Sequence, residues 1–276
     1  MQAHLEGPLS PAMATRRRAR ASKKWTRSER LRRLLLAALL AAPLACSRQT
    51  ADPEPAAPPL EPSAISIDDL PVWLSARKGR YAVDLRDPNA FASGHLRGAI
   101  NLQSSHGQFA QRAARFFPAG SQLALLGDDP VEAERAIRAV AARFAGSRWL
   151  VDKATRLAEL GHPLRRQTTI EVRAAFELLR EGSALLIDAR TAEEYAEGHA
   201  PSAVLVYPDD FIRQLAFLRL EKPILVIADK GWRSSQLVSL LDHYGFKDAR
   251  NVMAGMLGWK EAALPLERGD DQVGLK

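Results

Sequence analysis

The sequence predicts an α/β fold with two similar domains, each a mainly parallel central sheet flanked by helices. An internal repeat is the first observation: "YAVDLRDPNAFASGHLRGAINL" (81–102) resembles "LLIDARTAEEYAEGHAPSAVLV" (185–206), with matched positions 104 residues apart. The second observation is that apolar strand-like runs alternate with helix-like runs in both copies. Duplication and alternation of this kind indicate two copies of one parallel α/β unit. We place them at 64–166 and 167–268, followed by a tail at 269–276.

Each copy shows the same expected order of elements. A short strand and an amphipathic helix come first, then an apolar strand ending in aspartate, a short helix, a fully buried strand and a last long helix. The first pair falls at 64–80 and 168–183, the aspartate strand at 82–84 and 185–188, the buried strand at 122–127 and 223–228, and the last helix at 131–146 and 233–246.

The short helix carries start and stop signals in both copies. Asp87 can cap it in the first copy, with Pro88 in the first helical turn. Thr191 and Glu194 fit a capping box in the second copy. We expect a left-handed glycine to end each helix, at Gly94 and Gly198.

Residues 1–46 have the pattern of an export signal. Ten Lys/Arg stand against two Glu, and the apolar run "LLLAALLAAPLAC" (34–46) ends at the only cysteine, Cys46. The run has the length of a signal-peptide core and is short for a membrane span. It is similar to a bacterial lipoprotein signal, although Pro43 stands where leucine is usual. We therefore expect a lipid on Cys46 and an exported protein tethered to an envelope membrane, facing the periplasm.

Other interpretations of this segment stay open. Cleavage after Ala45 without lipidation gives a soluble periplasmic protein, and an uncleaved anchor is a third alternative. Arg32-Arg33 before the leucines also resembles a twin-arginine export signal, and a start at Met13 would shorten the basic region. Residues 47–63 are proline-rich and predict an extended linker, either a tether or a spacer with no further role.

The distribution of charge argues against a nucleic-acid partner. The net charge of +7 resides in residues 1–46, so the rest of the chain is close to neutral. A DNA-binding arm is the alternative interpretation, but the apolar run that follows favours export. Because the chain has one cysteine, it can form no internal disulfide.

The loop after the second buried strand has the pattern of an anion cradle. "ILVIADKGWRSS" (224–235) passes from an apolar strand through a glycine turn into a helix, and such a helix start presents N–H groups to anions. We expect an oxyanion or a protein partner to bind at this loop. The candidate residues are Asp229, Lys230, Gly231, Trp232, Arg233 and Ser234. The alternative is that Arg233 pairs with a neighbouring carboxylate and that Gly231 serves turn geometry alone.

These motifs together resemble the rhodanese family, specifically a tandem of two rhodanese domains. The resemblance rests on the strand-Asp-x-Arg and Gly-His signature in both copies, and on "KPILVIADKGWRSSQLVSLLDHYGFKDARNVMAGMLGWKEAALPLE" in the second. It covers about three quarters of the chain. The resemblance implies a cysteine as first loop residue, whose thiolate carries a sulfane sulfur from donor to acceptor.

The sequence departs from that pattern at the decisive position. Ala228 stands there in the second copy and Gly127 in the first, and neither can act as a nucleophile. Asp229 is one residue out of place, and a carboxylate does not carry sulfane sulfur. In the first copy, "GDDPVEAER" (127–135) places two aspartates and a proline where donors and cations are needed, which disfavours an anion.

The remaining motif residues have structural interpretations that we favour. We expect Asp84/Arg86 and Asp188/Arg190 to bond at strand ends, and His95 and His199 to fix turns. Of the tryptophans, we expect Trp149 and Trp259 to pack in a core or between domains, and Trp232 to make an exposed contact. No residue spacing predicts a metal site or a nucleotide loop, so we expect no metal and no cofactor.

We therefore predict a pseudoenzyme: a tethered tandem rhodanese-like protein with no catalytic residue, which binds an anion or a partner at the second loop. Two alternatives stay open. One is a sulfur-transferring enzyme that uses a partner's thiol, and the other is an envelope scaffold that uses neither loop.

Overall fold

The computed structural model describes residues 61–105, 108–206, 211–214 and 222–269. The predicted export signal and most of the linker lie outside this part of the chain. Within it, no helix is both long enough and apolar enough to cross a membrane.

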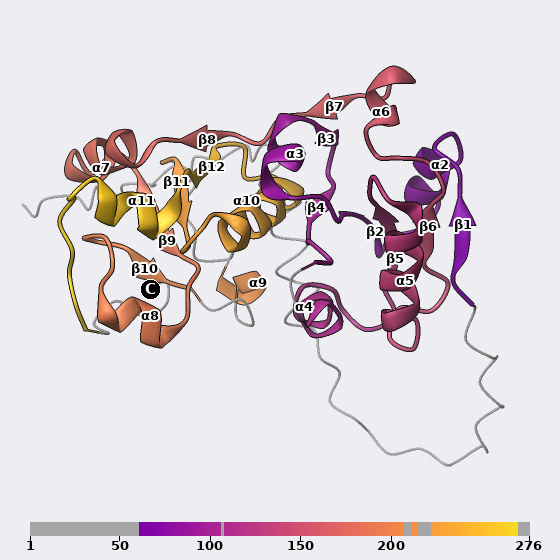
Figure 1. The fold of residues 1–276 in the computed structure, drawn as a ribbon, viewed down its shortest axis with the longest axis horizontal. Coiled ribbons are helices and arrows are strands. Elements are labelled where there is room, and N and C mark those ends of the chain that lie inside the picture. The colour runs from indigo at the N-terminus through magenta and orange to yellow at the C-terminus, as the bar shows by residue number, and fades with distance from the viewer. Residues whose placement is uncertain (1–60, 106–107, 207–210, 215–221, 270–276) are drawn as a thin grey trace, which may run out of the picture. The chain divides into compact units, whose positions relative to one another are not determined.

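The predicted fold class is confirmed, because the described residues form two five-stranded sheets whose paired strands all run parallel (Figure 1). The first sheet has the order β1-β6-β5-β2-β4: Ser63–Ile65, Arg148–Leu150, Gln122–Leu126, Arg80–Asp84 and Ile100–Asn101. The second has the order β8-β12-β11-β9-β10: Thr169–Ile170, Ala249–Val252, Ile224–Ile227, Leu185–Asp188 and Val204–Leu205. The two orders are the same when strands are matched along the chain, so the sequence repeat is a repeat of topology.

Helices connect these strands in both copies. In the first copy they are α2 (Leu70–Ser75), α3 (Pro88–Ser93), α4 (Phe109–Phe116), α5 (Pro130–Val140) and α6 (Arg156–Glu159). In the second they are α7 (Val172–Arg180), α8 (Ala192–Glu197), α9 (Phe211–Gln214), α10 (Trp232–His243) and α11 (Gly255–Glu261).

The helix-start signals behave as the sequence predicts. Asp87 accepts hydrogen bonds from the amides of Asn89 and Ala90 at the start of α3. Thr191 and Glu194 form both bonds of a capping box at the start of α8. Each bond satisfies an amide that the helix itself leaves without a partner.

The two helix-ending glycines differ from the prediction. Gly94 and Gly198 do end α3 and α8, but their φ angles of 173° and 163° are extended rather than left-handed. After each glycine the chain continues in an extended conformation and pairs with a segment from later in the sequence. In the first copy, strand β3 (His95–Leu96) pairs with β7 (Leu164–Arg165). In the second copy, His199 pairs with Glu267. A Cβ on Gly94 would lie 3.3 Å from Leu164 Cδ1, so close approach of the returning strand is what this position requires.

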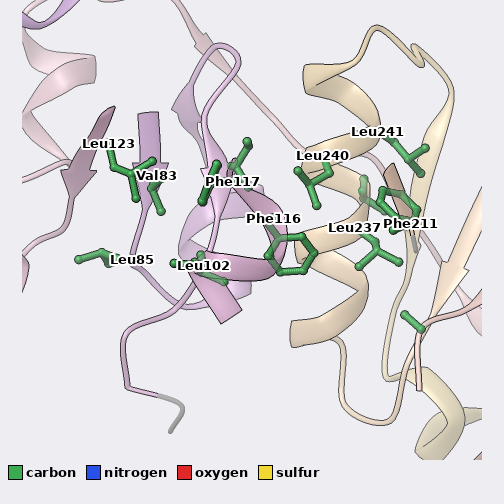
Figure 2. Packing of buried hydrophobic residues seen from close by; sticks show 14 of the residues in the cluster. Val83, Leu85, Leu102, Phe116, Phe117, Leu123, Phe211, Leu237, Leu240 and Leu241 are labelled. Atoms are coloured by element: carbon green, nitrogen blue, oxygen red, sulfur yellow. The ribbon is translucent and has the colours of Figure 1, made fainter. Parts of the chain in front are cut away.

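Helix α10 is buried along eight consecutive residues, Ser234 to Leu241. The largest core cluster joins Leu237, Leu240 and Leu241 of this helix to first-copy residues such as Phe116 and Phe117 (Figure 2). Packing therefore covers every face of this stretch, including the side chain of Gln236, which is 4% exposed. The two sheets therefore share one hydrophobic cluster around α10.

Polar bonds accompany this shared packing. The amide of Asn101 donates to Ser239 Oγ at 3.0 Å, and Ser235 Oγ donates to Asn101 Oδ1 at 3.0 Å. Gln167, the first residue of the second copy, donates from Nε2 to the Ser235 carbonyl at 3.0 Å. Buried hydroxyl groups of α10 thus find partners in the first copy, as buried polar groups must.

Candidate functional site

The second-copy loop begins at Ala228, directly after the central strand β11. The Ala189 amide donates to the Ile227 carbonyl at 2.8 Å, which fixes the strand end beside β9. Ala228 is 1% exposed, so its methyl group is enclosed. The first residue of the loop therefore stands at the carboxyl edge of the sheet, where ligands of parallel α/β folds bind.

The N-terminus of α11 holds the loop from one side. The amide of Met256 donates to the Ala228 carbonyl at 2.7 Å, and that of Leu257 to the Asp229 carbonyl at 3.3 Å. Gly255 permits this contact, because its φ is +58° and a Cβ there would lie 2.2 Å from the Ala228 oxygen. Two loop carbonyls are thus drawn toward α11 by hydrogen bonds.

The opposite side of the loop is the start of α10. Gly231 has φ +94° and precedes the helix, which has no side-chain cap. Ser234 Oγ and the Ser235 amide both donate to the Gly231 carbonyl, each at 2.9 Å. Lys230 is exposed beside the turn. The first-turn amides of α10 and the Lys230 ammonium are therefore groups that can attract an anion.

Arg233 is engaged by Glu194, as in the alternative that the sequence left open. Its Nη1 and Nη2 donate to the two carboxylate oxygens at 2.5 and 2.7 Å. This bidentate pair, with the Thr191 amide bond as a further contribution, lowers the pKa of Glu194 to about 2. The Arg233 guanidinium is thus already paired with a carboxylate of the same chain.

Trp232 lies half-buried at the start of α10 and faces cations. The Arg112 guanidinium of α4 lies 5.6 Å from its ring centroid, and that of Arg233 lies 5.4 Å away. Both distances permit a cation–π contact. Trp232 therefore connects the loop to the first copy rather than projecting into solvent alone.

The first-copy loop has the same backbone position and a different chemistry. Gly127 follows β5, and its carbonyl accepts from the Ala154 amide at 2.8 Å, as the Ala228 carbonyl accepts from Met256. Asp129 caps α5 by accepting from the Val131 amide at 2.9 Å, and Asp128 accepts from the Thr155 amide at 3.0 Å. The Asp129 carboxylate therefore occupies the start of α5, while the Asp128 carboxylate bonds to the residue before α6.

The two Asp-x-Arg motifs are buried ion pairs. Arg190 donates to Asp188 through Nε at 3.0 Å and Nη2 at 2.7 Å, and Nη2 also donates to the Gly198 carbonyl at 2.9 Å. Arg86 makes the same bonds to Asp84, at 3.0 and 2.7 Å, and to the Gly94 carbonyl at 2.8 Å. Each pair ties a strand end to the Gly-His turn, so the role is structural.

The two histidines sit inside those turns. His95 and His199 are each 3% exposed, and their Nδ1 atoms lie 2.8 and 2.9 Å from the carbonyls of Phe91 and Tyr195. Each imidazole stacks on the same residue's ring at 3.7 Å. Burial lowers the pKa of His95. Both side chains fix the turn, as expected.

Trp259 and Trp149, the other two tryptophans considered in the sequence, are packing residues. Trp259 is fully buried, donates from Nε1 to the Pro265 carbonyl at 2.9 Å and contacts Phe176 edge-on. Trp149 packs, partly buried, against the shared cluster. Among the residues that the structure describes, no group of three or more His, Cys, Asp or Glu is placed to hold a metal ion.

Sequence reasoning missed two contributions to the site. Glu194 was assigned only to the capping box, although the same carboxylate holds Arg233. The close approach of α11 at Gly255 was also missed, and its one signal in the sequence was the glycine pair around Met256 and Leu257 in "AGMLGW". Both depend on elements that are distant along the chain.

Comparisons with known proteins agree with the fold. A family model described as "Rhodanese-like domain" matches residues 70–148 and 172–262, more than half of the chain. "Thiosulfate sulfurtransferase GlpE" of Actinobacillus pleuropneumoniae serotype 3 (strain JL03) is 31% identical over 100 residues, which are 36% of this chain and 93% of that protein. "Putative sulfurtransferase YtwF" of Bacillus subtilis (strain 168) is 38% identical over 80 residues, 29% of this chain and 77% of that protein.

A solved structure was also matched. The crystal structure of a thiosulfate sulfurtransferase from Pseudomonas aeruginosa aligns with 77% of this chain and 45% of that chain, at 19% identity and a TM-score of 0.37.

Proposed function

This chain belongs to the family of rhodanese-like domain proteins, and on that premise we propose that it is a pseudoenzyme that binds a small oxyanion at its second loop. It transfers no sulfur by itself. It is exported and held at a membrane through a lipid on Cys46.

The missing nucleophile supports the absence of sulfur transfer. The only cysteine is Cys46, outside both family matches, whereas Ala228 and Gly127 follow the two central strands. A methyl group or a hydrogen atom cannot accept a sulfane sulfur, so a covalent persulfide cannot form at either loop.

A contrast between the two loops carries the binding proposal. Asp129 caps α5 in the first copy, whereas α10 begins at Gly231 without a side-chain cap. The α10 amides and Lys230 are the attracting groups, because Arg233 is already paired with Glu194. An oxyanion that accepts from helix-start amides replaces the bonds that a capping carboxylate would make.

Anion titration with thermal unfolding tests the binding proposal. Thiosulfate, sulfate and phosphate are the probes, and at a hundred times its Kd a bound anion adds about 2.7 kcal/mol of stability. We expect Lys230→Ala to weaken this effect, while Lys247→Ala, another exposed lysine, leaves it unchanged. A titration with no stabilisation by any of the three anions would favour the scaffold alternative.

A sulfurtransferase assay tests the loss of activity. We expect no thiosulfate:cyanide transfer by the native chain, and restored transfer in Ala228→Cys, which places a thiol at the first loop residue. Gly127→Cys is the matched control, and we expect it to stay inactive because Asp128 and Asp129 repel the anionic donor. Turnover by the native chain would refute the proposal and favour the enzyme alternative.

Mass spectrometry of the mature N-terminus tests export and lipidation. We expect a chain that begins at Cys46 and carries a diacylglyceryl group. A chain that begins at an unmodified Cys46 would support secretory cleavage without a lipid anchor. A chain that keeps Met1 would show that no cleavage takes place.

A further inference from the structure

A groove beside the edge strand β1, far along the chain from either loop, has the features of a peptide-binding surface. Among the residues that the structure describes, strand β1 pairs with β6 alone and forms the end of its sheet (Figure 1). The groove between β1 and α2 has a volume of about 560 Å³. That volume lies within the range of ordinary ligand sites, which is about 300 to 1,000 Å³.

The backbone of β1 has hydrogen-bonding groups that face away from the sheet. The Ser63 amide donates to the Ser147 carbonyl at 3.3 Å, and the Ile65 carbonyl accepts from the Val151 amide at 3.1 Å, so both residues face β6. Because successive residues of a strand face opposite sides, the N–H and C=O of Ala64 face the open edge, and Ala64 is exposed. An edge of this kind accepts an added strand.

Apolar side chains line the groove and remain in contact with solvent. Val72 of α2 is 71% exposed and Val151 is 48% exposed, which is unusual for valines that share one groove. Trp73 also lines the groove, with the Arg80 guanidinium 4.4 Å from its ring centroid. An extended chain that places apolar side chains here would remove these surfaces from water.

The charge of the groove is positive. Arg80 and Arg148 line it together with one carboxylate, Asp69, which accepts a hydrogen bond from Ser66 Oγ. The two guanidinium groups bond to neutral partners: Arg80 Nη1 to the Trp73 carbonyl at 2.6 Å, and Arg148 Nη1 to Ser63 Oγ. Burial is the largest cause that lowers the pKa of Arg80, and the positive charges of Arg77 and Arg148 lower it further. The second effect agrees with an excess of positive charge in the groove.

We propose that this groove binds an acidic, extended segment of a partner protein as an added strand beside β1. The partner's backbone bonds to Ala64, its apolar side chains cover Val72 and Val151, and its carboxylates meet Arg80 and Arg148. Backbone pairing supplies affinity, and the arginines select the charge of the segment.

Fluorescence anisotropy with two synthetic peptides tests the proposal on the full chain. The probe is a labelled peptide of alternating glutamate and valine, and its control has lysine in place of glutamate. We expect the acidic peptide to bind at least about tenfold more tightly than the basic one. Equal binding of both peptides, or binding of neither, would overturn the proposal.

Three variants separate the contributions of backbone and charge. Ala64→Pro removes the outward N–H, and an edge strand tolerates proline at such a position, so we expect a folded protein that binds at least about tenfold more weakly. Arg148→Gln should weaken the acidic peptide alone. Arg135→Gln, at an exposed arginine of α5, should change nothing.

A second copy of the chain is the competing occupant, and sedimentation distinguishes it. A dimer that Ala64→Pro abolishes, without binding of either peptide, would assign the edge to self-association and refute a partner segment. Unfolding temperatures of the three variants, measured beside the native chain, show that a loss of binding is not a loss of fold.

Discussion

The ion pair between Glu194 and Arg233 allows a quantitative prediction about stability and pH. We consider Glu194→Gln, which removes the charge and keeps the size of the side chain. The fall of the Glu194 pKa from 4.5 to about 2 sets an upper bound of about 3 kcal/mol, at about 1.4 kcal/mol for each pH unit. Because the side chain is 35% exposed, solvent screening reduces that bound, and we expect a loss of about 1 to 2 kcal/mol at neutral pH.

The sign of the pH dependence follows from the direction of the pKa change. The carboxyl pKa is lower in the folded chain, so the pair stabilises fully above the unfolded pKa of about 4.5. The contribution is lost as the pH falls through 4.5 toward 2, where the folded carboxylate takes up a proton. The difference in unfolding free energy between the native chain and Glu194→Gln should therefore be constant near neutral pH. It should become smaller below about pH 4.

Urea unfolding at pH values of about 7, 4 and 3 measures this difference. Glu134→Gln is the matched control, because Glu134 pairs with Arg138 at 2.8 Å with side chains 39% and 56% exposed. An exposed pair of this kind contributes less than about 0.5 kcal/mol. Equal losses for the two variants, or a Glu194→Gln loss that does not change with pH, would show that the pair does not hold the loop.

Three further predictions concern the supports of the site. Asp188→Asn leaves the buried charge of Arg190 without its partner and should cost about 3 to 5 kcal/mol in urea unfolding; a loss below about 1 kcal/mol would mean that the pair is solvated. Gly255→Ala places a Cβ 2.2 Å from a loop carbonyl oxygen and should lower the unfolding temperature and abolish anion stabilisation; a variant that keeps both would contradict the close approach. Ser235→Ala removes one bond to Asn101 and should cost about 1 kcal/mol, visible as a lower urea midpoint with an unchanged slope; an unchanged midpoint would count against that bond.

Elements that depend on nearby residues could be predicted from the sequence. The capping residues Asp87 and Thr191 bond to partners within three residues. The local sequence is therefore enough to predict where these helices begin. The strand ends were also predictable, because an apolar run that stops at Ala228 can form a buried strand only up to that point. The corresponding apolar run of the first copy then gave the equivalent position, Gly127.

Features that depend on tertiary packing were not predictable. Arg233 lies 39 positions from Glu194, and the sequence offered several carboxylates without deciding among them. The glycines at 94 and 198 were expected to be left-handed, because the sequence does not show that a returning segment crosses them. That α10 would pack against both sheets could not be predicted from its own pattern, because serines and Gln236 stand among its apolar residues.

The shared cluster around α10 gives the first copy a structural role in the second. Without the first copy, Leu237, Leu240 and Leu241 would lose the first-copy residues of their cluster, and the helix that begins at the second loop would face water along one side. Because this cluster draws on both copies, we expect them to unfold together as one cooperative unit, in which the packing of the first copy keeps the second copy's helix in place.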